Sequence, residues 1–134
     1  MFRFGEIMDK TKVLNLNPVV LAFVGDAVYS LYVREKLVTN KDESAFVLNK
    51  KSADLVCAVN QAKYIDVILP MLTEEELLVY KRARNTKKGT RAKNASVTEY
   101  NKSTGFEALI GFLYLTKQTE RLKFLLELGE NYEN

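Results

Sequence analysis

Two apolar stretches of the sequence each contain one acidic residue where the neighbouring residues indicate a helix core. Residues 19–33 read VVLAFVGDAVYSLYV and include Asp26, and residues 106–115 read FEALIGFLYL and include Glu107. An ionised carboxylate in a packed interior is costly unless a positive group meets it. Two such acids in one small chain are better explained by one shared cation than by two separate exceptions. The pair therefore predicts a metal site.

The composition limits the chemistry of that site. The chain contains no histidine and one cysteine, Cys57, which excludes Ser-His-Asp and Cys-His nucleophile schemes and zinc sites built from histidine or cysteine clusters. Oxygen ligands remain, and they suit Mg²⁺, with Mn²⁺ as the other candidate. Cys57 lies in a helical pattern without a disulfide partner, so we expect a small core residue and a reducing, cytoplasmic location.

Positive charge is concentrated in one part of the chain. Residues 82–94 (RARNTKKGTRAKN), the basic segment, hold six basic residues and no acid, whereas the rest of the chain has a net charge of −3. The lack of apolar periodicity predicts an exposed loop that extends to about residue 96. The concentrated positive charge indicates that this loop binds a polyanion. A charge run that is only solvated is the alternative. Basic side chains neutralise phosphates, and asparagines reach sugars or base edges. The residues expected to contact this polyanion are Arg82, Arg84, Asn85, Lys87, Lys88, Arg91, Lys93 and Asn94.

The rest of the sequence predicts helices and no strand. Its length of 134 residues fits one domain with one core. Charged residues interrupt the apolar stretches before they reach membrane-spanning length, so we expect a soluble protein. The expected fold is an all-α helical bundle over residues 1–134, with the basic loop between helices. The predicted helices run from Pro18 to about Leu37, from a Ser44 cap to Pro70, from a Thr73 capping box into the basic segment, from a start between Val97 and Thr104 through Glu107, and from Glu120 to Gly129.

Two motifs and the segment between them resemble the ribonuclease III family. FVGDAVYSLYV resembles the signature helix of the family, in which a Gly-Asp pair supplies a metal-binding aspartate, and TGFEALIGFLYL resembles the partner helix with a second acidic ligand. The basic segment resembles the loop that the short branch of the family, Mini-ribonuclease III, inserts into an RNA duplex. This branch lacks a double-stranded-RNA-binding domain, and we expect none in this chain. The resemblance covers essentially the whole sequence and implies a ribonuclease III-like catalytic domain.

The resemblance assigns Asp26 and Glu107 as catalytic residues and Mg²⁺ ligands. The larger enzymes of the family have two further acids, at positions where this chain has Ala22 and Thr104. Two carboxylates imply a single, well-hydrated metal whose ligand shell RNA completes. Ser103 and Thr104 are expected to cap a helix rather than to hold waters of that shell.

The same resemblance implies a homodimer in which each protomer cuts one strand of an RNA duplex and leaves a short 3′ overhang. The implied substrate is a stem of the large-subunit ribosomal RNA precursor, with a ribosomal protein as a further partner on the substrate. Taken alone, the apolar excess of residues 19–33, with Phe23, Tyr29 and Tyr32 around the helix, fits a dimer interface and a central core helix equally well.

Two other functions fit parts of this pattern. A non-catalytic RNA-binding or ribosome-assembly module on the same fold would have lost its metal site. A helical interaction protein would pair Asp26 and Glu107 with lysine or arginine in the core, and its basic segment would only be solvated. The retention of both costly acids favours the catalytic interpretation.

Overall fold

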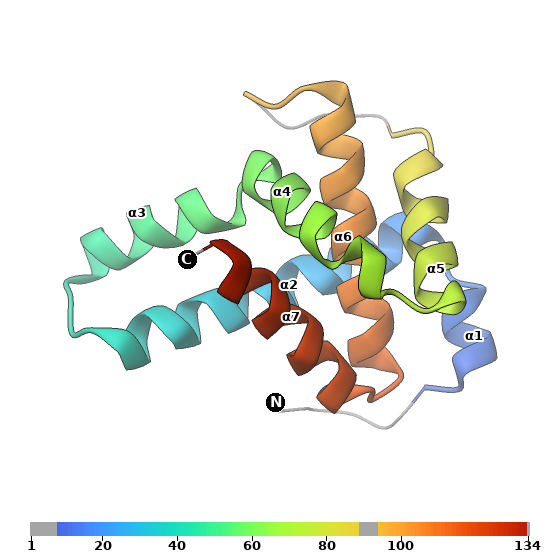
Figure 1. Ribbon diagram of the computed structural model, residues 1–134, viewed down its shortest axis with the longest axis horizontal. Coiled ribbons are helices and arrows are strands. Elements are labelled where there is room, and N and C mark those ends of the chain that lie inside the picture. The colour runs from blue at the N-terminus through green and yellow to red at the C-terminus, as the bar shows by residue number, and fades with distance from the viewer. Residues whose placement is uncertain (1–7, 89–93, 134) are drawn as a thin grey trace.

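The structure is a computed structural model that describes residues 8–88 and 94–133. These residues form seven α-helices and one short 3-10 helix, and none of them lies in a strand (Figure 1). The all-α prediction is confirmed. No helix in the described ranges is both long and apolar enough to cross a membrane. The elements are α1 (Lys10–Leu14), α2 (Pro18–Asn40), α3 (Ala45–Val56), α4 (Ala58–Ile68), η1 (Leu69–Met71), α5 (Glu74–Asn85), α6 (Val97–Leu115) and α7 (Thr119–Glu133).

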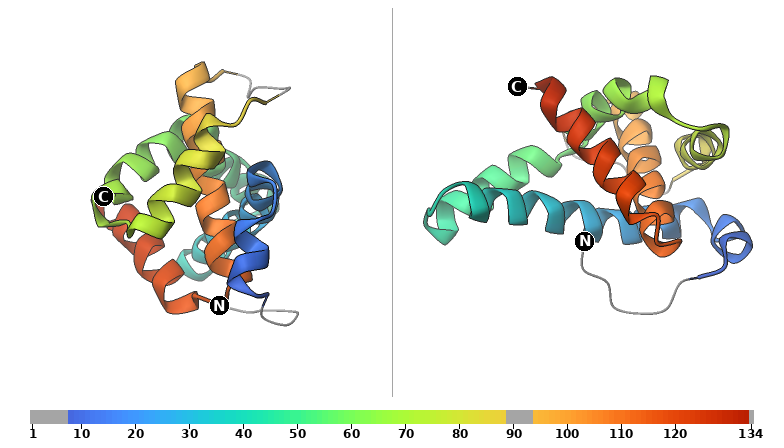
Figure 2. Two further views of the ribbon diagram at one scale, coloured as in Figure 1. Left: turned by 90° about the vertical axis from the view of Figure 1, so that its right-hand side faces the viewer. Right: turned by 60° about the horizontal axis from the view of Figure 1, so that its bottom comes forward.

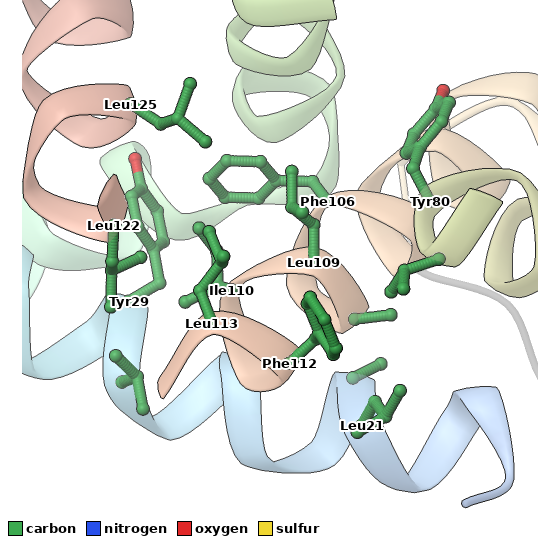
Figure 3. Close-up of a cluster of buried hydrophobic side chains, with 14 of the residues drawn as sticks. Leu21, Tyr29, Tyr80, Phe106, Leu109, Ile110, Phe112, Leu113, Leu122 and Leu125 are labelled. Atoms are coloured by element: carbon green, nitrogen blue, oxygen red, sulfur yellow. The ribbon is translucent and has the colours of Figure 1, made fainter. Parts of the chain in front are cut away.

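Helix α6 is the central helix, and α2, α4, α5 and α7 surround it (Figure 1 and Figure 2). Its second half is apolar on every side, as is typical of a helix that is buried all round. Figure 3 shows its side chains packed among those of α2 and α7. Tyr29 of α2 meets Phe106 of α6 edge to face, with 5.0 Å between the ring centroids. The α6 side chains with no exposed surface include Phe106, Leu109, Ile110, Phe112 and Leu113.

The helices begin directly after the capping residues that the sequence indicates. Asn17, Ser44 and Thr73 each accept a hydrogen bond from a backbone amide in the first turn of α2, α3 and α5. Thr73 also forms a capping box with Glu76, which satisfies a further backbone amide at the start of α5. Helix α6 begins at Val97, within the predicted interval. These predicted starts are confirmed.

The predicted helix from Ser44 to Pro70 is wrong in one respect, because the chain breaks at Cys57 into α3 and α4. Cys57 has an extended backbone, with φ −66° and ψ 156°. Asn60 Nδ2 donates a hydrogen bond to Leu55 O at 2.8 Å, which satisfies a carbonyl group at the break. The turn allows α3 to follow α2 while α4 packs on α6. Cys57 is exposed, which corrects the prediction of a core residue.

Helix α7 continues through Gly129, so the predicted helix end at this glycine is wrong. A Cβ atom at Gly129 would overlap the ring of Tyr64 on α4. The glycine therefore permits close packing of two helices and does not act as a C-cap. Helix α1 was not predicted, because five residues carry too little periodicity to indicate a helix.

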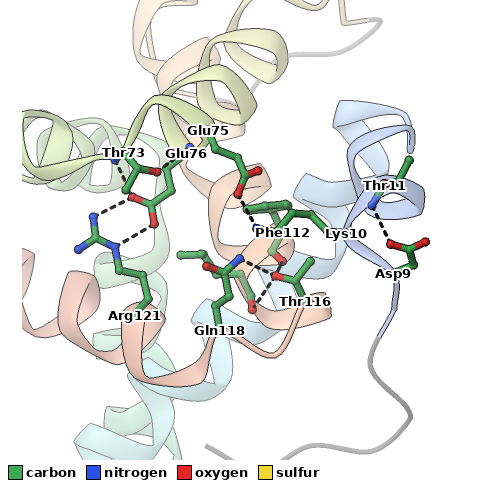
Figure 4. Close-up of polar contacts among 11 residues, drawn as sticks. Asp9, Lys10, Thr11, Thr73, Glu75, Glu76, Phe112, Thr116, Gln118 and Arg121 are labelled. Carbon is green, nitrogen blue, oxygen red and sulfur yellow. Dashed lines mark hydrogen bonds and ion pairs between the residues drawn. The ribbon is translucent and has the colours of Figure 1, made fainter.

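A buried ion pair holds α7 against α5 (Figure 4). Arg121 donates to both carboxylate oxygens of Glu76, from Nε and from Nη2, each at 2.8 Å. Arg121 Nη2 also donates to Met71 O at 2.6 Å. Burial alone would raise the pKa of Glu76, but the hydrogen bonds from Arg121 and from the Thr73 amide outweigh burial and lower it. The negative charge of this buried acid is fully compensated.

Candidate active site

Asp26 and Glu107 meet where α2 crosses α6. Gly25 precedes Asp26, and a Cβ atom at Gly25 would overlap the backbone carbonyl of Glu107. Gly111, one turn after Glu107, makes the reciprocal contact, because a Cβ atom there would overlap the backbone carbonyl of Leu21. Only glycine lets two helix backbones approach this closely. The packing of the helices therefore places the two acids side by side.

The carboxylates of Asp26 and Glu107 lie within hydrogen-bonding reach of each other. Glu107 is partly buried, whereas Asp26 is exposed in the single chain. The exposure of Asp26 corrects the expectation that both acids lie in the core. Helix α2 is apolar on most of its sides, so the hydropathy of the sequence does not show which side packs against α6.

The acid pair has no positive partner among the residues that the structure describes. Burial is the main reason that the pKa of Glu107 is raised to about 9, and the hydrogen bond and charge of Asp26 add to this effect. A hydrogen bond from Gln61 opposes it. No lysine or arginine in residues 8–88 and 94–130 forms an ion pair with either acid. This result argues against the helical interaction protein, which requires such ion pairs.

Gln61 of α4 is the third polar side chain at the site. Its Nε2 atom donates to Glu107 Oε2 at 3.3 Å, and the residue is only 2% exposed. Reasoning from the sequence missed Gln61. A signal was present, because Gln61 shares a helix face with the buried Ile65 and Ile68, where the spacing predicts an apolar side chain.

The donor set fits one hydrated divalent cation. The described residues contain no group of three or more histidine, cysteine, aspartate or glutamate side chains that could hold a metal. Asp26 and Glu107 nevertheless offer hard oxygen donors at one place, and Asp26 is open to solvent. A cation that retains several waters needs only one or two protein carboxylates. It would also supply the positive charge that the pair lacks.

The positions at which the larger ribonuclease III enzymes carry further acids supply no ligand here. Ala22 is buried on α2, and Thr104 is buried on α6. The hydroxyl groups of Ser103 and Thr104 donate to the backbone carbonyl of Tyr100, at 2.7 and 3.1 Å. The expectation that these two residues cap a helix is wrong, because α6 begins earlier and its cap is Ser96.

The basic segment begins within α5, because residues 82–85 form the last turn of this helix. The prediction of an exposed loop from residue 82 is therefore wrong for these four residues, of which Ala83 is buried. Arg91 and Lys93 lie outside the described residues. Lys87 and Asn94 lie outside the helices and are exposed, as predicted for a loop, and Asn85 is exposed at the end of α5. The candidate RNA contacts that the structure describes are Arg82, Arg84, Asn85, Lys87, Lys88 and Asn94.

Two arginines on the last turn of α5 are held by neighbouring groups. Arg82 Nη1 donates to Leu14 O at 2.7 Å, which joins α5 to the end of α1. The guanidinium of Arg84 lies over the ring of Tyr80, 5.5 Å from its centroid. Both side chains therefore have defined positions at the start of the basic segment.

Lys88 is the residue of the described part of the basic segment whose ammonium group donates hydrogen bonds to three protein oxygens. It donates to Arg84 O at 3.1 Å, to Thr86 O at 2.7 Å and to Asn101 Oδ1 at 3.2 Å. Burial lowers the pKa of Lys88. The first two contacts satisfy carbonyl groups at the end of α5, and the third joins the basic segment to α6.

Helix α6 fixes the spacing between the basic segment and the acids. Val97, the first residue of α6, lies ten residues before Glu107, which is about 15 Å along a helix. A cleft lies at the start of α6 and is lined in part by the basic segment. Its lining residues include Arg84, Asn85, Lys87, Val97, Tyr100 and Asn101.

The substitution Glu107→Gln is expected to stabilise the protein in the presence of a chelator. Because its pKa is raised to about 9, Glu107 contributes stability that is full below its usual pKa and is lost as the pH rises toward 9. The stability of the wild type should therefore fall between about pH 5 and pH 9. The variant should lack this fall and gain at least about 1 kcal/mol at pH 9, since one pKa unit is worth about 1.4 kcal/mol.

Denaturant unfolding at several pH values measures this effect. Glu120→Gln, which removes an exposed glutamate of α7, is the matched control and should keep the wild-type profile. Added Mg²⁺ should raise the Tm of the wild type and of the control but not that of Glu107→Gln. Identical pH profiles for the wild type and Glu107→Gln would show that the pKa of Glu107 is not raised.

Known proteins match this chain in sequence and in fold. The ribonuclease III domain family matches residues 19–118, which include both acids and the basic segment. The chain is 47% identical over 124 residues to a Mini-ribonuclease 3 of Thermoanaerobacter sp. (strain X514), covering 92% of this chain and 87% of that protein. It is 45% identical over 128 residues to a Mini-ribonuclease 3 of Clostridium tetani, covering 95% and 85%.

A solved structure gives the same result. The crystal structure of a protein from Fusobacterium nucleatum matches with a TM-score of 0.81 and 32% sequence identity, covering 92% of this chain and 98% of that one. These matches confirm the resemblance that the two motifs and the basic segment indicated. The chain belongs to the ribonuclease III family, in its Mini-ribonuclease 3 branch.

Proposed function

We propose that this endoribonuclease cuts double-stranded RNA at a divalent cation, Mg²⁺ or Mn²⁺, that Asp26 and Glu107 hold. One observation carries the proposal. The α2–α6 crossing brings two carboxylates together, no lysine or arginine of residues 8–88 and 94–130 forms an ion pair with them, and Asp26 is exposed to solvent. The family supplies the class of reaction, hydrolysis of an RNA phosphodiester bond.

The two acids have different tasks in this proposal. The cation, when bound, would offset the negative charge of the phosphate and lower the pKa of a water molecule bound to it. Asp26 is the exposed ligand and is therefore accessible to RNA from the solvent. Glu107 is the inner ligand, and Gln61 donates a hydrogen bond to it. With two protein carboxylates, water and RNA phosphate complete the ligand shell, so metal affinity without RNA is expected to be weak.

The basic segment binds the phosphate backbone of the duplex. Its exposed Lys87 and its arginines at the end of α5 supply charge, while Asn85 and Asn94 offer hydrogen bonds to sugars or base edges. Arg91 and Lys93 belong to the same proposed set. We assign Lys88 a structural role instead, because its ammonium group already donates to three protein oxygens.

A homodimer would place two such sites on one duplex, so that each protomer cuts one strand and leaves a short 3′ overhang. Helix α2 carries large apolar side chains that the single chain leaves exposed, while Tyr29 on its other side packs in the core. A row of exposed apolar residues on one helix is typical of an interface. The exposed set is Val19, Val20, Phe23, Leu31 and Val38, of which Phe23 is 79% exposed.

The substrate that we propose is a duplex stem of the large-subunit ribosomal RNA precursor. The support is the resemblance to the Mini-ribonuclease III branch and the identity of 40–48% with several proteins of that name. A large-subunit ribosomal protein bound to this RNA is a further proposed partner. Precursor processing of this kind places the enzyme in the cytoplasm.

Cleavage of a labelled RNA duplex at low salt tests the site. Asp26→Asn and Glu107→Gln should each reduce the rate by a factor of about 100 or more, because loss of groups that only support a metal ligand already costs 10–100-fold. Both variants should still bind the duplex through the basic segment. The control is Glu120→Gln, which should cut at the wild-type rate.

Two outcomes would contradict the proposal. Near-full cleavage by either acid variant, or by the wild type in a chelator, would exclude the metal site. Tight duplex binding by the wild type without any cleavage would indicate the non-catalytic RNA-binding module.

The salt dependence of duplex binding tests the basic segment, in the Asp26→Asn background so that RNA stays intact. Lys87→Met should reduce the slope of log K against log salt by about 0.7–0.9, the value of one phosphate contact. It should leave the Tm unchanged, because Lys87 is exposed. Lys88→Met should have the opposite pattern, with a lower Tm and the same slope. A flat salt response of the parent protein would rule out phosphate binding.

Sedimentation equilibrium tests the dimer. Phe23→Gln should convert the dimer to a monomer at micromolar concentration, since it replaces a large apolar side chain with a polar one in the proposed interface. Leu78→Gln is the matched control, because Leu78 is 55% exposed on α5 and should not affect association. A monomeric wild type would contradict the proposed arrangement.

A further inference from the structure

Gln61 is a buried polar side chain that reaches from one helix to another. Ser103 and Thr104 are also buried, but their hydroxyl groups bond to a carbonyl of their own helix. Gln61 lies on α4 and donates to the carboxylate of Glu107 on α6. Burying an amide is costly unless it is hydrogen-bonded, and a leucine or methionine would fill this position without that cost. The amide therefore requires an explanation beyond packing.

Glutamine suits this position because it is a neutral hydrogen-bond donor. A lysine at residue 61 would form an ion pair with Glu107 and would compete with a metal cation for the carboxylate. A glutamate would add a third negative charge to a pair that already lacks compensation. The amide of Gln61 orients one oxygen of Glu107 and leaves the charge of the pair available to a cation.

The backbone beneath Gln61 and Glu107 is fixed by one aromatic cluster. Tyr64, three residues after Gln61, lies 5.2 Å from Phe106, measured between ring centroids. Phe106 directly precedes Glu107 and is fully buried. On its other side, Tyr64 packs against Gly129 of α7. Gln61, the donor, and Glu107, the acceptor, therefore lie on parts of α4 and α6 whose relative position is fixed by the packing of the core.

We propose that Gln61 is a positioning residue that holds the Glu107 carboxylate toward Asp26, so that the pair is arranged for a divalent cation before RNA binds. The inference rests on the proposed function, since it deepens the account of the same site. The hydrogen bond limits rotation of the Glu107 side chain. Without it, the carboxylate would have to be ordered when the cation binds, which weakens binding.

Titration of the Tm with Mg²⁺, in the absence of RNA, tests the inference. Gln61→Met keeps the volume and removes the donor, and the Mg²⁺ concentration at the midpoint should rise 10–100-fold, the usual effect of losing a group that supports a metal ligand. Gln61→Asn keeps an amide but shortens the side chain, so it is the second variant to use if Gln61→Met does not fold. It should give the same rise in the Mg²⁺ midpoint. Gln118→Met is the matched control, because Gln118 bonds to Thr116 in the α6–α7 turn.

Cleavage of duplex RNA by the same variants separates positioning from a general loss of activity. At saturating Mg²⁺, the Gln61 variants should recover most of the wild-type rate, whereas at low Mg²⁺ they should fall well below it. An unchanged Mg²⁺ midpoint in the folded variants would overturn the inference, even if their Tm in chelator were lower. If the wild type shows neither a Mg²⁺-dependent Tm nor cleavage, the proposed function fails, and this inference fails with it.

Discussion

The close crossing of α2 and α6 is the constraint on which the rest of the structure depends. Gly25 and Gly111 allow the two backbones to approach so closely that a Cβ atom at either position would overlap the other helix, and Leu21 is buried at the same contact. Because Gly25 precedes Asp26 and lies against the carbonyl of Glu107, the packing of the core and the geometry of the acid pair are one feature. Any change that alters this crossing also moves the carboxylates relative to each other, so stability and site geometry cannot vary independently.

The buried Glu76 and the partly buried Glu107 have opposite electrostatic surroundings. Glu76 receives two hydrogen bonds from Arg121, and its pKa is lowered although burial opposes this. Glu107 faces another carboxylate, Asp26, and a neutral amide, and burial and the neighbouring charge raise its pKa to about 9. Among the described residues, Glu76 has an arginine partner and Glu107 has none, which supports the proposal that a cation from outside the protein binds at Glu107.

The sequence predicted those features that depend on neighbouring residues. Asn17 and Thr73 mark helix starts because a cap joins residues only two or three positions apart. The acid pair was found because two acids interrupt apolar stretches. The break at Cys57, the packing role of Gly129 and the contact of Gln61 with the acid pair were not predicted. Each of these depends on contact between helices that are distant in the sequence, which local patterns do not encode.

Helix α6 couples the basic segment to the acid pair. Asn101 accepts a hydrogen bond from Lys88, and Glu107 follows six residues later, about 9 Å along the same helix. A helix packed on all sides transmits position rigidly. In the proposed mechanism, a duplex bound by the basic segment therefore lies at a set distance from the cation, and its phosphate oxygens can replace the two acids that larger family members carry. In this proposal, a site with two carboxylates is sufficient because the protein fixes the position of the RNA that would complete the ligand shell.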